Sequence, residues 1–237
     1  MSSPRRPFIV AIDGPAGAGK STASRLLAVR LGFALVDTGA IYRTVALAAT
    51  RLGVGLEDDG GLRALLPEVD VHFAPSATGG SGQRVLLGTE DVSALIRTPA
   101  ISAGASKVSA RPVVRAGLLD LQRRLAAAPE NRGAVLEGRD IGTVVFPDAD
   151  AKFFVTASPE ERARRRYGEL LAKGDASTFE QVLADQRARD KADSEREIAP
   201  LRPAADALVI DTSGTPIDAV VERLVREVEE RVARSRG

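Results

Sequence analysis

An apolar run that leads into a glycine-rich loop and then a helical pattern is the feature that most limits the fold of this 237-residue chain. Residues 8–13 read Phe-Ile-Val-Ala-Ile-Asp, residues 14–22 read Gly-Pro-Ala-Gly-Ala-Gly-Lys-Ser-Thr, and residues 20–31 have helical spacing. The loop matches the pattern G-x-x-x-x-G-K-S, which binds nucleotide phosphates when it joins a strand to a helix. The sequence therefore predicts a strand, a phosphate-binding loop and a helix within a fold of α/β type.

The residue types of this loop suit a nucleoside triphosphate. Its glycines let backbone N–H groups approach phosphate oxygens, and the helix that follows turns its positive end toward the same anion. We expect Lys20 to reach the β- and γ-phosphates and the Ser21 hydroxyl to bind Mg²⁺. The predicted ATP-binding residues of the loop are Gly14, Pro15, Ala16, Gly17, Ala18, Gly19, Lys20, Ser21 and Thr22. A glycine-rich turn before an ordinary helix is the plainer alternative, and the flanking strand and helix patterns disfavour it.

Composition and charge limit the partners and the chemistry that can be expected of this chain. Thirty-three basic residues nearly cancel 32 acidic ones, so net charge gives no reason to expect a nucleic-acid or membrane partner. Cysteine is absent, which excludes disulfides and thiol chemistry. The N-terminal residues lead to an apolar run much shorter than a signal peptide or a membrane span. We expect a cytoplasmic monomer that binds small molecules.

Short strand patterns alternate with amphipathic helix patterns, as in a parallel sheet flanked by helices. The predicted strands are 8–13, 33–36, 134–137, 152–156 and 207–211, and the predicted helices are 20–31, 38–52, 99–109, 112–128, 159–173, 178–194 and 216–234. The expected fold class is α/β with a five-stranded parallel sheet.

One segment, residues 54–97, interrupts this alternation. Extended runs at 69–73 and 84–87 flank the Ser/Gly-rich stretch 76–82, which is typical of a hairpin. We therefore predict a single domain over 1–237 with a core of 8–53 and 98–235, a small β-rich insert at 54–97, and a lid region at about 160–194.

Arginines stand where a phosphate group could be bound. Arg139 and Asp140 follow a predicted strand, at the edge where a parallel sheet binds ligands. Arg189, Asp193 and Arg196 have helical spacing, which places them on one helix face. A planar guanidinium suits several phosphate oxygens at once. Solvated surface charges and ordinary ion pairs between neighbouring turns are the alternatives for these residues.

Several blocks of the chain, from about residue 8 to 225, resemble the bacterial cytidylate kinases. These blocks are the phosphate-binding loop, Asp37-Thr38-Gly39-Ala40-Ile41-Tyr42-Arg43, Glu90-Asp91-Val92-Ser93, Ile96-Arg97-Thr98, Gly138-Arg139-Asp140-Ile141-Gly142-Thr143-Val144-Val145-Phe146-Pro147-Asp148, Ala199-Pro200-Leu201 and Pro203-Ala204-Ala205-Asp206-Ala207. The blocks after the loop are more specific than the loop itself. The resemblance implies a P-loop kinase fold with a substrate-binding insert and a short helical lid.

The resemblance also implies an activity and a set of site residues. The activity is ATP-dependent phosphorylation of CMP and dCMP with Mg²⁺, in which Lys20, Arg139, Arg189 and Arg196 are catalytic. The acceptor phosphate would contact Thr38, Arg43, Arg139 and Arg196. The pyrimidine would contact Ser106, Arg115 and Asp140, and the sugar would contact Arg189 and Asp193. Thr38 replaces the serine of the family pattern and keeps its hydroxyl. Arg162, Arg164, Arg165 and Arg166 lie in the lid segment, and we assign Arg162 and Arg165 to ATP.

Two points about the chemistry stay open in the sequence. Asp37 either helps to hold Mg²⁺, beside Ser21, or caps the helix that follows it. The acceptor phosphate needs no general base, and the single histidine, His72, lies in the insert and is expected to be structural.

Two alternative functions share the loop. A P-loop kinase for another nucleotide or for shikimate would have the same loop and arginines, but the block at 138–147 and the insert disfavour it. A GTP-dependent switch is the alternative from another class, and the chain lacks the N-K-x-D guanine signature.

Overall fold

The computed structural model describes residues 6–75, 83–128, 131–172 and 174–236. It divides into two compact units: the first comprises residues 1–35 and 129–237, and the second comprises residues 36–128. The predicted hairpin loop at 76–82 lies outside the described residues. No helix of the described chain has both the length and the apolar character that crossing a membrane requires.

The first unit is built on a five-stranded sheet with the order β2-β6-β1-β7-β8, in which β2 runs across the boundary between the two units. The strands are β1 (Phe8–Asp13), β2 (Ala34–Asp37), β6 (Gly133–Gly138), β7 (Ala151–Thr156) and β8 (Leu208–Asp211). Strand β1 pairs in parallel with β6, with Phe8 opposite Gly133, and also in parallel with β7, with Val10 opposite Ala151. The predicted five-stranded parallel sheet is confirmed, and each strand lies within two residues of its predicted position.

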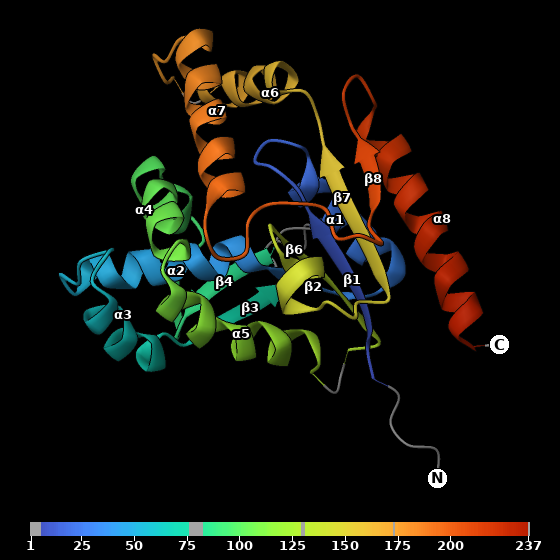
Figure 1. Cartoon of the computed structure of the whole chain (residues 1–237), viewed down its shortest axis with the longest axis horizontal. Coiled ribbons are helices and arrows are strands. Elements are labelled where there is room, and N and C mark those ends of the chain that lie inside the picture. Colours follow the sequence, from blue (N-terminus) through green and yellow to red (C-terminus); the bar gives the residue numbers. More distant parts are fainter. Residues whose placement is uncertain (1–5, 76–82, 129–130, 173, 237) are drawn as a thin grey trace. The chain divides into compact units, whose positions relative to one another are not determined.

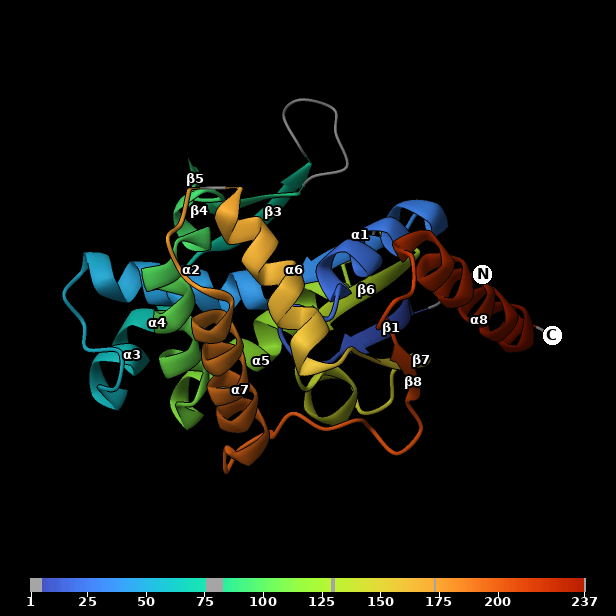
Figure 2. The same cartoon turned by 90° about the horizontal axis from the view of Figure 1, so that it is seen from above.

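Helices α1 (Lys20–Leu31) and α8 (Ile217–Arg236) lie side by side against the sheet (Figures 1 and 2). Val10 and Ile12 alternate along β1 and belong to the same buried cluster as Leu27 of α1, Phe153 of β7 and Leu224 of α8. This alternation places Val10 and Ile12 on one face of β1. The cluster fixes β1 and α1, and with them the two ends of the glycine-rich loop.

Two further helices of the first unit, α6 (Pro159–Leu171) and α7 (Phe179–Glu195), pack against each other (Figure 1). The Ser158 hydroxyl accepts a hydrogen bond from the Glu161 N–H and caps α6. Thr178 and Gln181 form a reciprocal capping box at the start of α7. These caps explain why both helices begin within a residue of their predicted positions.

The end of α7 corrects the expectation that Arg189, Asp193 and Arg196 share a helix face. The helix ends at Glu195, and Arg196 has an extended backbone with φ −60° and ψ 138°. The chain then folds back so that the Leu201 N–H bonds to the Asp193 carbonyl at 2.8 Å. This bond satisfies a carbonyl at the helix end that has no partner within the helix. Arg196 therefore projects from a loop, while Arg189 and Asp193 stay on α7.

The second unit contains helices and a three-stranded antiparallel sheet with the order β3-β4-β5. Its elements are α2 (Thr38–Arg51), α3 (Asp59–Leu65), β3 (Val71–Pro75), β4 (Gln83–Leu87), β5 (Glu90–Asp91), α4 (Pro99–Ser109) and α5 (Pro112–Ala126), with two 3₁₀ turns at Leu66–Glu68 and Leu95–Arg97. The predicted antiparallel hairpin is confirmed by the pairing of Phe73 with Val85. Helix α3, which the sequence did not predict, is capped by the Asp58 carboxylate through the Gly60 and Gly61 N–H groups.

Candidate active site

The predicted phosphate-binding residues of the first unit lie at the carboxyl edge of its sheet. The glycine-rich loop follows β1 and Arg139 follows β6, and Thr212, which the sequence did not predict, follows β8. The carboxyl ends of parallel strands meet at one edge, which is where open α/β sheets bind ligands. The fold therefore brings these segments together although more than a hundred residues separate the loop from Arg139.

Three carbonyl groups of the loop accept hydrogen bonds from within the first unit. Lys20 Nζ donates to the Pro15 carbonyl at 2.7 Å, and Thr212 Oγ1 donates to the Ala18 carbonyl at 3.1 Å. The carbonyl of Ala16 accepts from Gln186 Nε2 at 2.5 Å and from Arg162 Nη1 at 3.2 Å. In a planar trans peptide, the C=O of one residue and the N–H of the next point in opposite directions. These bonds therefore orient the loop N–H groups away from the carbonyl side, as an anion site requires.

Lys20 is buried, with 4% of its surface exposed. Burial, and after it the nearby positive charge of Arg139, lowers the pKa of its ammonium from 10.5 to about 7. Glu137 and Asp13 act in the opposite direction, and Arg189 adds to the lowering. A phosphate anion beside this group would favour its charged form. The site is thus cationic and desolvated where the predicted ligand carries negative charge.

Ser21 and Glu137 form an oxygen pair beside the loop. The Ser21 hydroxyl donates to Glu137 Oε1 at 2.6 Å. A hydroxyl and a carboxylate are ligands that Mg²⁺ accepts, usually with waters and substrate phosphates completing its shell. The sequence analysis did not single out Glu137, although its place near the end of a predicted strand, next to Gly138 and Arg139, was a usable signal. The donor set at Ser21 fits Mg²⁺.

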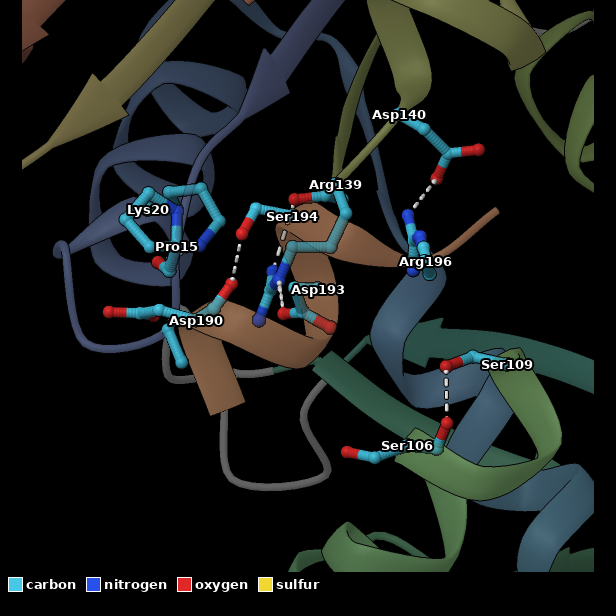
Figure 3. A network of polar contacts seen from close by, with 12 residues as sticks. Pro15, Lys20, Ser106, Ser109, Arg139, Asp140, Asp190, Asp193, Ser194 and Arg196 are labelled. Carbon is cyan, nitrogen blue, oxygen red and sulfur yellow. Dashed lines mark hydrogen bonds and ion pairs between the residues drawn. The ribbon is translucent and has the colours of Figure 1, made fainter. Parts of the chain in front are cut away.

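The predicted acceptor-binding residues of the first unit form two ion pairs (Figure 3). Arg139 Nε donates to Asp193 Oδ2 at 3.1 Å, and Arg139 Nη1 donates to the Gly138 carbonyl at 3.1 Å. Arg196 Nη2 lies 3.7 Å from Asp140 Oδ1, and both side chains are buried. Arg196 Nε also donates to the carbonyl of Ala199. Asp140 thus pairs with Arg196, which the sequence did not predict.

The four arginines of α6 differ in what they contact. Arg162 is buried and binds both carboxylate oxygens of Asp190, at 3.0 and 2.6 Å. Arg165 donates to Thr212 and to Glu161, and its guanidinium lies close to Gly19 of the loop. Arg164 and Arg166 are more exposed and pair with glutamates of their own helix. The structure therefore brings Arg162 and Arg165 to the loop, the two that the sequence analysis assigned to ATP.

The second unit holds the remaining predicted residues. Thr38 is buried at the start of α2, and Ser106 lies on α4, where its hydroxyl donates to the Ser102 carbonyl. The Arg115 guanidinium lies over the Tyr42 ring at 5.6 Å and donates to the Ser109 carbonyl.

Asp37 caps α2 in this unit. Its Oδ1 accepts from the Ala40 N–H at 2.8 Å, and its Oδ2 accepts from Arg43 Nη2 at 2.9 Å. One carboxylate oxygen of Asp37 thus caps α2, and the other pairs with Arg43. In the parts of the chain that the structure describes, no group of three or more His, Asp or Glu side chains is arranged as a metal cluster.

Asp13 is a positioning residue that the sequence analysis missed. Its two carboxylate oxygens accept from the backbone N–H groups of Ile141 and Gly142, both at 2.8 Å. These groups open the π-helical turn Ile141–Val145, directly after Arg139 and Asp140. Burial raises the pKa of Asp13 from 3.8 to about 6, against the lowering effect of these two hydrogen bonds. The last residue of β1 thus ties the segment after β6 to the loop strand.

The raised pKa of Asp13 predicts a pH-dependent term in stability. Between about pH 4 and pH 6, Asp13 is protonated in the folded protein and ionised in the unfolded chain. Proton binding therefore stabilises the folded state at low pH, and this contribution is lost as the pH rises through 6. Between pH 5 and 7.5 it amounts to roughly 1 kcal/mol. We expect the free energy of urea unfolding of the wild type, minus that of Asp13→Asn, to fall by this amount when the pH is raised from 5 to 7.5. A difference that stays constant with pH would remove the assignment.

A sequence model of the family described as cytidylate kinase matches residues 10–230. A cytidylate kinase of Geobacter sulfurreducens is 53% identical over 227 residues, which cover 96% of this chain and 95% of the relative. A cytidylate kinase of Pseudomonas aeruginosa is 50% identical over 221 residues, 93% of this chain and 95% of the relative.

Among solved structures, an uncharacterized protein from Eubacterium ventriosum has a TM-score of 0.51 at 12% identity. The match covers 94% of this chain and 98% of the chain of that protein, and it concerns the fold alone. The family match and the identities near 50%, each over more than nine-tenths of the chain, agree with the phosphate-binding loop and with Arg139 at the sheet edge. The chain belongs to the cytidylate kinase family.

Proposed function

We propose that this protein transfers the γ-phosphoryl group of ATP to CMP and to dCMP, giving the nucleoside diphosphate and ADP. Phosphorylation of CMP to CDP is the activity of the family to which the chain belongs. The observation that supports it best in the structure is Lys20, a buried ammonium in the phosphate-binding loop that interacts electrostatically with Arg139 and Arg189. Three neighbouring cations suit a transition state whose charge is spread over phosphate oxygens.

The proposed roles follow from what each group can do. Lys20 and the loop N–H groups bind the β- and γ-phosphates, while Arg139, Arg189 and Arg196 neutralise charge on the transferred and accepting phosphates. The acceptor phosphate is its own nucleophile, because its second pKa is about 6 and it is largely ionised at neutral pH. Catalysis therefore rests on alignment and charge rather than on a general base.

Magnesium is the proposed cofactor, with ATP as the phosphoryl donor. Ser21 is the proposed ligand, and Glu137, whose Oε1 accepts a hydrogen bond from the Ser21 hydroxyl at 2.6 Å, is the carboxylate beside it. When bound beside Ser21 and Glu137, Mg²⁺ would supply positive charge that offsets the negative charge of the ATP phosphates. A metal role for Asp37 stays a prediction, since both of its oxygens accept hydrogen bonds within its own unit.

Recognition of cytosine is the finer part of the proposal. Cytosine presents an amino donor beside two acceptors, so a carboxylate such as Asp140 suits the amino group and the donors Ser106 and Arg115 suit the acceptors. Thr38 and Arg43 are proposed to bind the acceptor phosphate, and Arg189 and Asp193 the sugar. Arg162 and Arg165 are proposed to bind ATP from α6.

Asp140→Asn tests the base assignment. Uracil has a carbonyl oxygen where cytosine has the amino group, so a carboxylate there disfavours UMP by about ten- to a hundredfold. The asparagine amide can turn a donor toward that oxygen, and we expect the ratio of kcat/KM for CMP to that for UMP to fall by about tenfold. Both substrates would be measured on both proteins with ATP saturating. If Asp140 serves only to hold Arg196, kcat/KM falls for CMP and UMP by the same factor, which would contradict the base assignment.

A coupled assay of ADP release tests the function itself. With CMP, dCMP, UMP, AMP and shikimate as separate acceptors, the expected result is ADP release that depends on CMP and dCMP. A kinase for another acceptor would respond to a different compound, and a nucleotide-dependent switch would respond to none of them.

Four further points remain predictions from the sequence. They are the cytoplasmic location, the monomeric state, the absence of nucleic-acid and membrane partners, and the domain boundaries.

A further inference from the structure

Gln186 of α7 contacts the phosphate-binding loop directly. Its amide Nε2 donates to the Ala16 carbonyl at 2.5 Å, although 170 residues separate the two in sequence. The side chain is buried, with 8% of the residue exposed. A Cβ atom built on Gly17 would lie 2.9 Å from the same Nε2 atom. The amide of Gln186 and the Ala16–Gly17 peptide are therefore in close contact.

The orientation of that peptide decides whether the loop can bind an anion. Because the peptide is planar and trans, a carbonyl directed toward Gln186 turns the Gly17 N–H in the opposite direction. Gly17 has φ +77°, in the left-handed region that glycine tolerates, so the backbone itself does little to fix this peptide. The Ala16 carbonyl can accept two hydrogen bonds, and it receives two, from Gln186 and from Arg162.

The two donors have different surroundings. Arg162 is engaged on several sides, since it also donates to the Ala157 carbonyl and to both oxygens of Asp190. Arg162 is in addition proposed to contact ATP. The Ala16 carbonyl, at 3.2 Å, therefore competes with Asp190 and with the phosphates of ATP for the donors of Arg162. Gln186 is a neutral amide, which lacks the charge that would draw it toward a phosphate. Gln186 is therefore the donor suited to hold the loop whether or not nucleotide is bound.

We propose that Gln186 is a positioning residue for ATP binding, which holds the Ala16–Gly17 peptide with its N–H turned toward the phosphates. Gln186 touches the loop rather than the reacting atoms, so it acts through the loop. The proposal deepens the proposed function by assigning a role in ATP binding to a residue that neither the loop pattern nor the family resemblance singles out. It rests on that function only in taking the bound nucleotide to be ATP.

The test compares ATP and CMP affinity in variants of the full chain. Gln186→Met keeps the side-chain length and removes the donor, and Gln186→Glu keeps the shape and turns a second acceptor toward the carbonyl. Arg187→Met is the matched control, because Arg187 also joins α7 to α6, through an exposed ion pair with Glu160. Calorimetry would give the Kd of a non-hydrolysable ATP analogue with Mg²⁺, and separately the Kd of CMP. Thermal unfolding would show that each variant is folded.

The expected result is a three- to tenfold rise, roughly the effect of one hydrogen bond, in the Kd of the ATP analogue for Gln186→Met, and at least as large a rise for Gln186→Glu. The Kd of CMP should change by less than about twofold in both variants, and Arg187→Met should bind the analogue like wild type. An unchanged Kd for the analogue in either folded Gln186 variant would overturn the proposal. Equal losses of ATP and CMP affinity would also overturn it, because they indicate a merely structural role. Wild-type protein that binds the analogue but not CMP would contradict the proposed function, and the analogue measurements would still decide the role of Gln186.

Discussion

Replacing Lys20 by alanine should lower kcat by about two to three orders of magnitude while the protein stays folded. The ammonium lies in the phosphate-binding loop, bonded to the Pro15 carbonyl and surrounded by the charges of Arg139, Arg189 and Glu137. Burial and the charge of Arg139 lower the pKa of Lys20 to about 7, so its charged form is disfavoured in the free protein. A phosphate that develops negative charge in the transition state would stabilise that charged form. The loss should therefore appear in catalysis rather than in folding.

The measurement is steady-state kinetics with CMP and ATP, together with the thermal midpoint of each protein. Lys191→Ala is the matched control, because Lys191 is an exposed lysine of α7 that pairs with Glu195 within its own helix. The control should retain the wild-type kcat. A folded Lys20→Ala protein with near-normal kcat would contradict the assignment of this loop to catalysis.

Replacing Arg139 by methionine should lower kcat/KM for CMP by about a hundredfold or more. Arg139 is held by Asp193 and by the Gly138 carbonyl, and its charge lowers the pKa of Lys20. A methionine keeps much of the side-chain volume and removes all five donors. The pKa of Lys20 should rise in this variant, because the cation that lowers it is gone.

Arg30→Met provides the comparison, since Arg30 forms an exposed ion pair with Glu222, away from the sheet edge that carries the loop. Exposed pairs of this kind contribute about 1 kcal/mol or less, so the control should differ little from wild type in both kinetics and stability. If the Arg139 and Arg30 variants both retained kcat/KM for CMP, Arg139 would not be an acceptor-phosphate ligand.

The sequence predicted the elements whose determinants are local. Strand β1 and helices α1 and α4 have the predicted bounds, because an apolar run, a glycine-rich loop and an N-terminal proline mark them. Helix α3 was missed because Gly60 and Gly61 have low helix propensity, and the cap from Asp58 outweighs that propensity. The end of α7 was placed correctly within one residue, but the position of Arg196 depends on a chain reversal that local patterns do not reveal.

The site was predictable only where a motif marks it. The loop, Arg139 and Asp140 stand in recognisable blocks, and the structure places them at the carboxyl edge of the sheet. Gln186, Thr212 and Asp13 were not predicted, because each is a single polar residue in an ordinary helical or strand context. Their contacts with the loop or the turn after β6 join segments 128 to 194 residues apart, so tertiary packing alone creates them.

Transfer of a radiolabelled γ-phosphoryl group from ATP to CMP is the most direct test of the proposed function. With Mg²⁺ present, the label should appear in CDP in a one-to-one ratio with the ADP formed, and omission of CMP should abolish both products. The Lys20→Ala protein should form both products about a hundred to a thousand times more slowly. Label that appears in inorganic phosphate whether or not CMP is present would contradict the assignment of this protein as a CMP-phosphorylating enzyme.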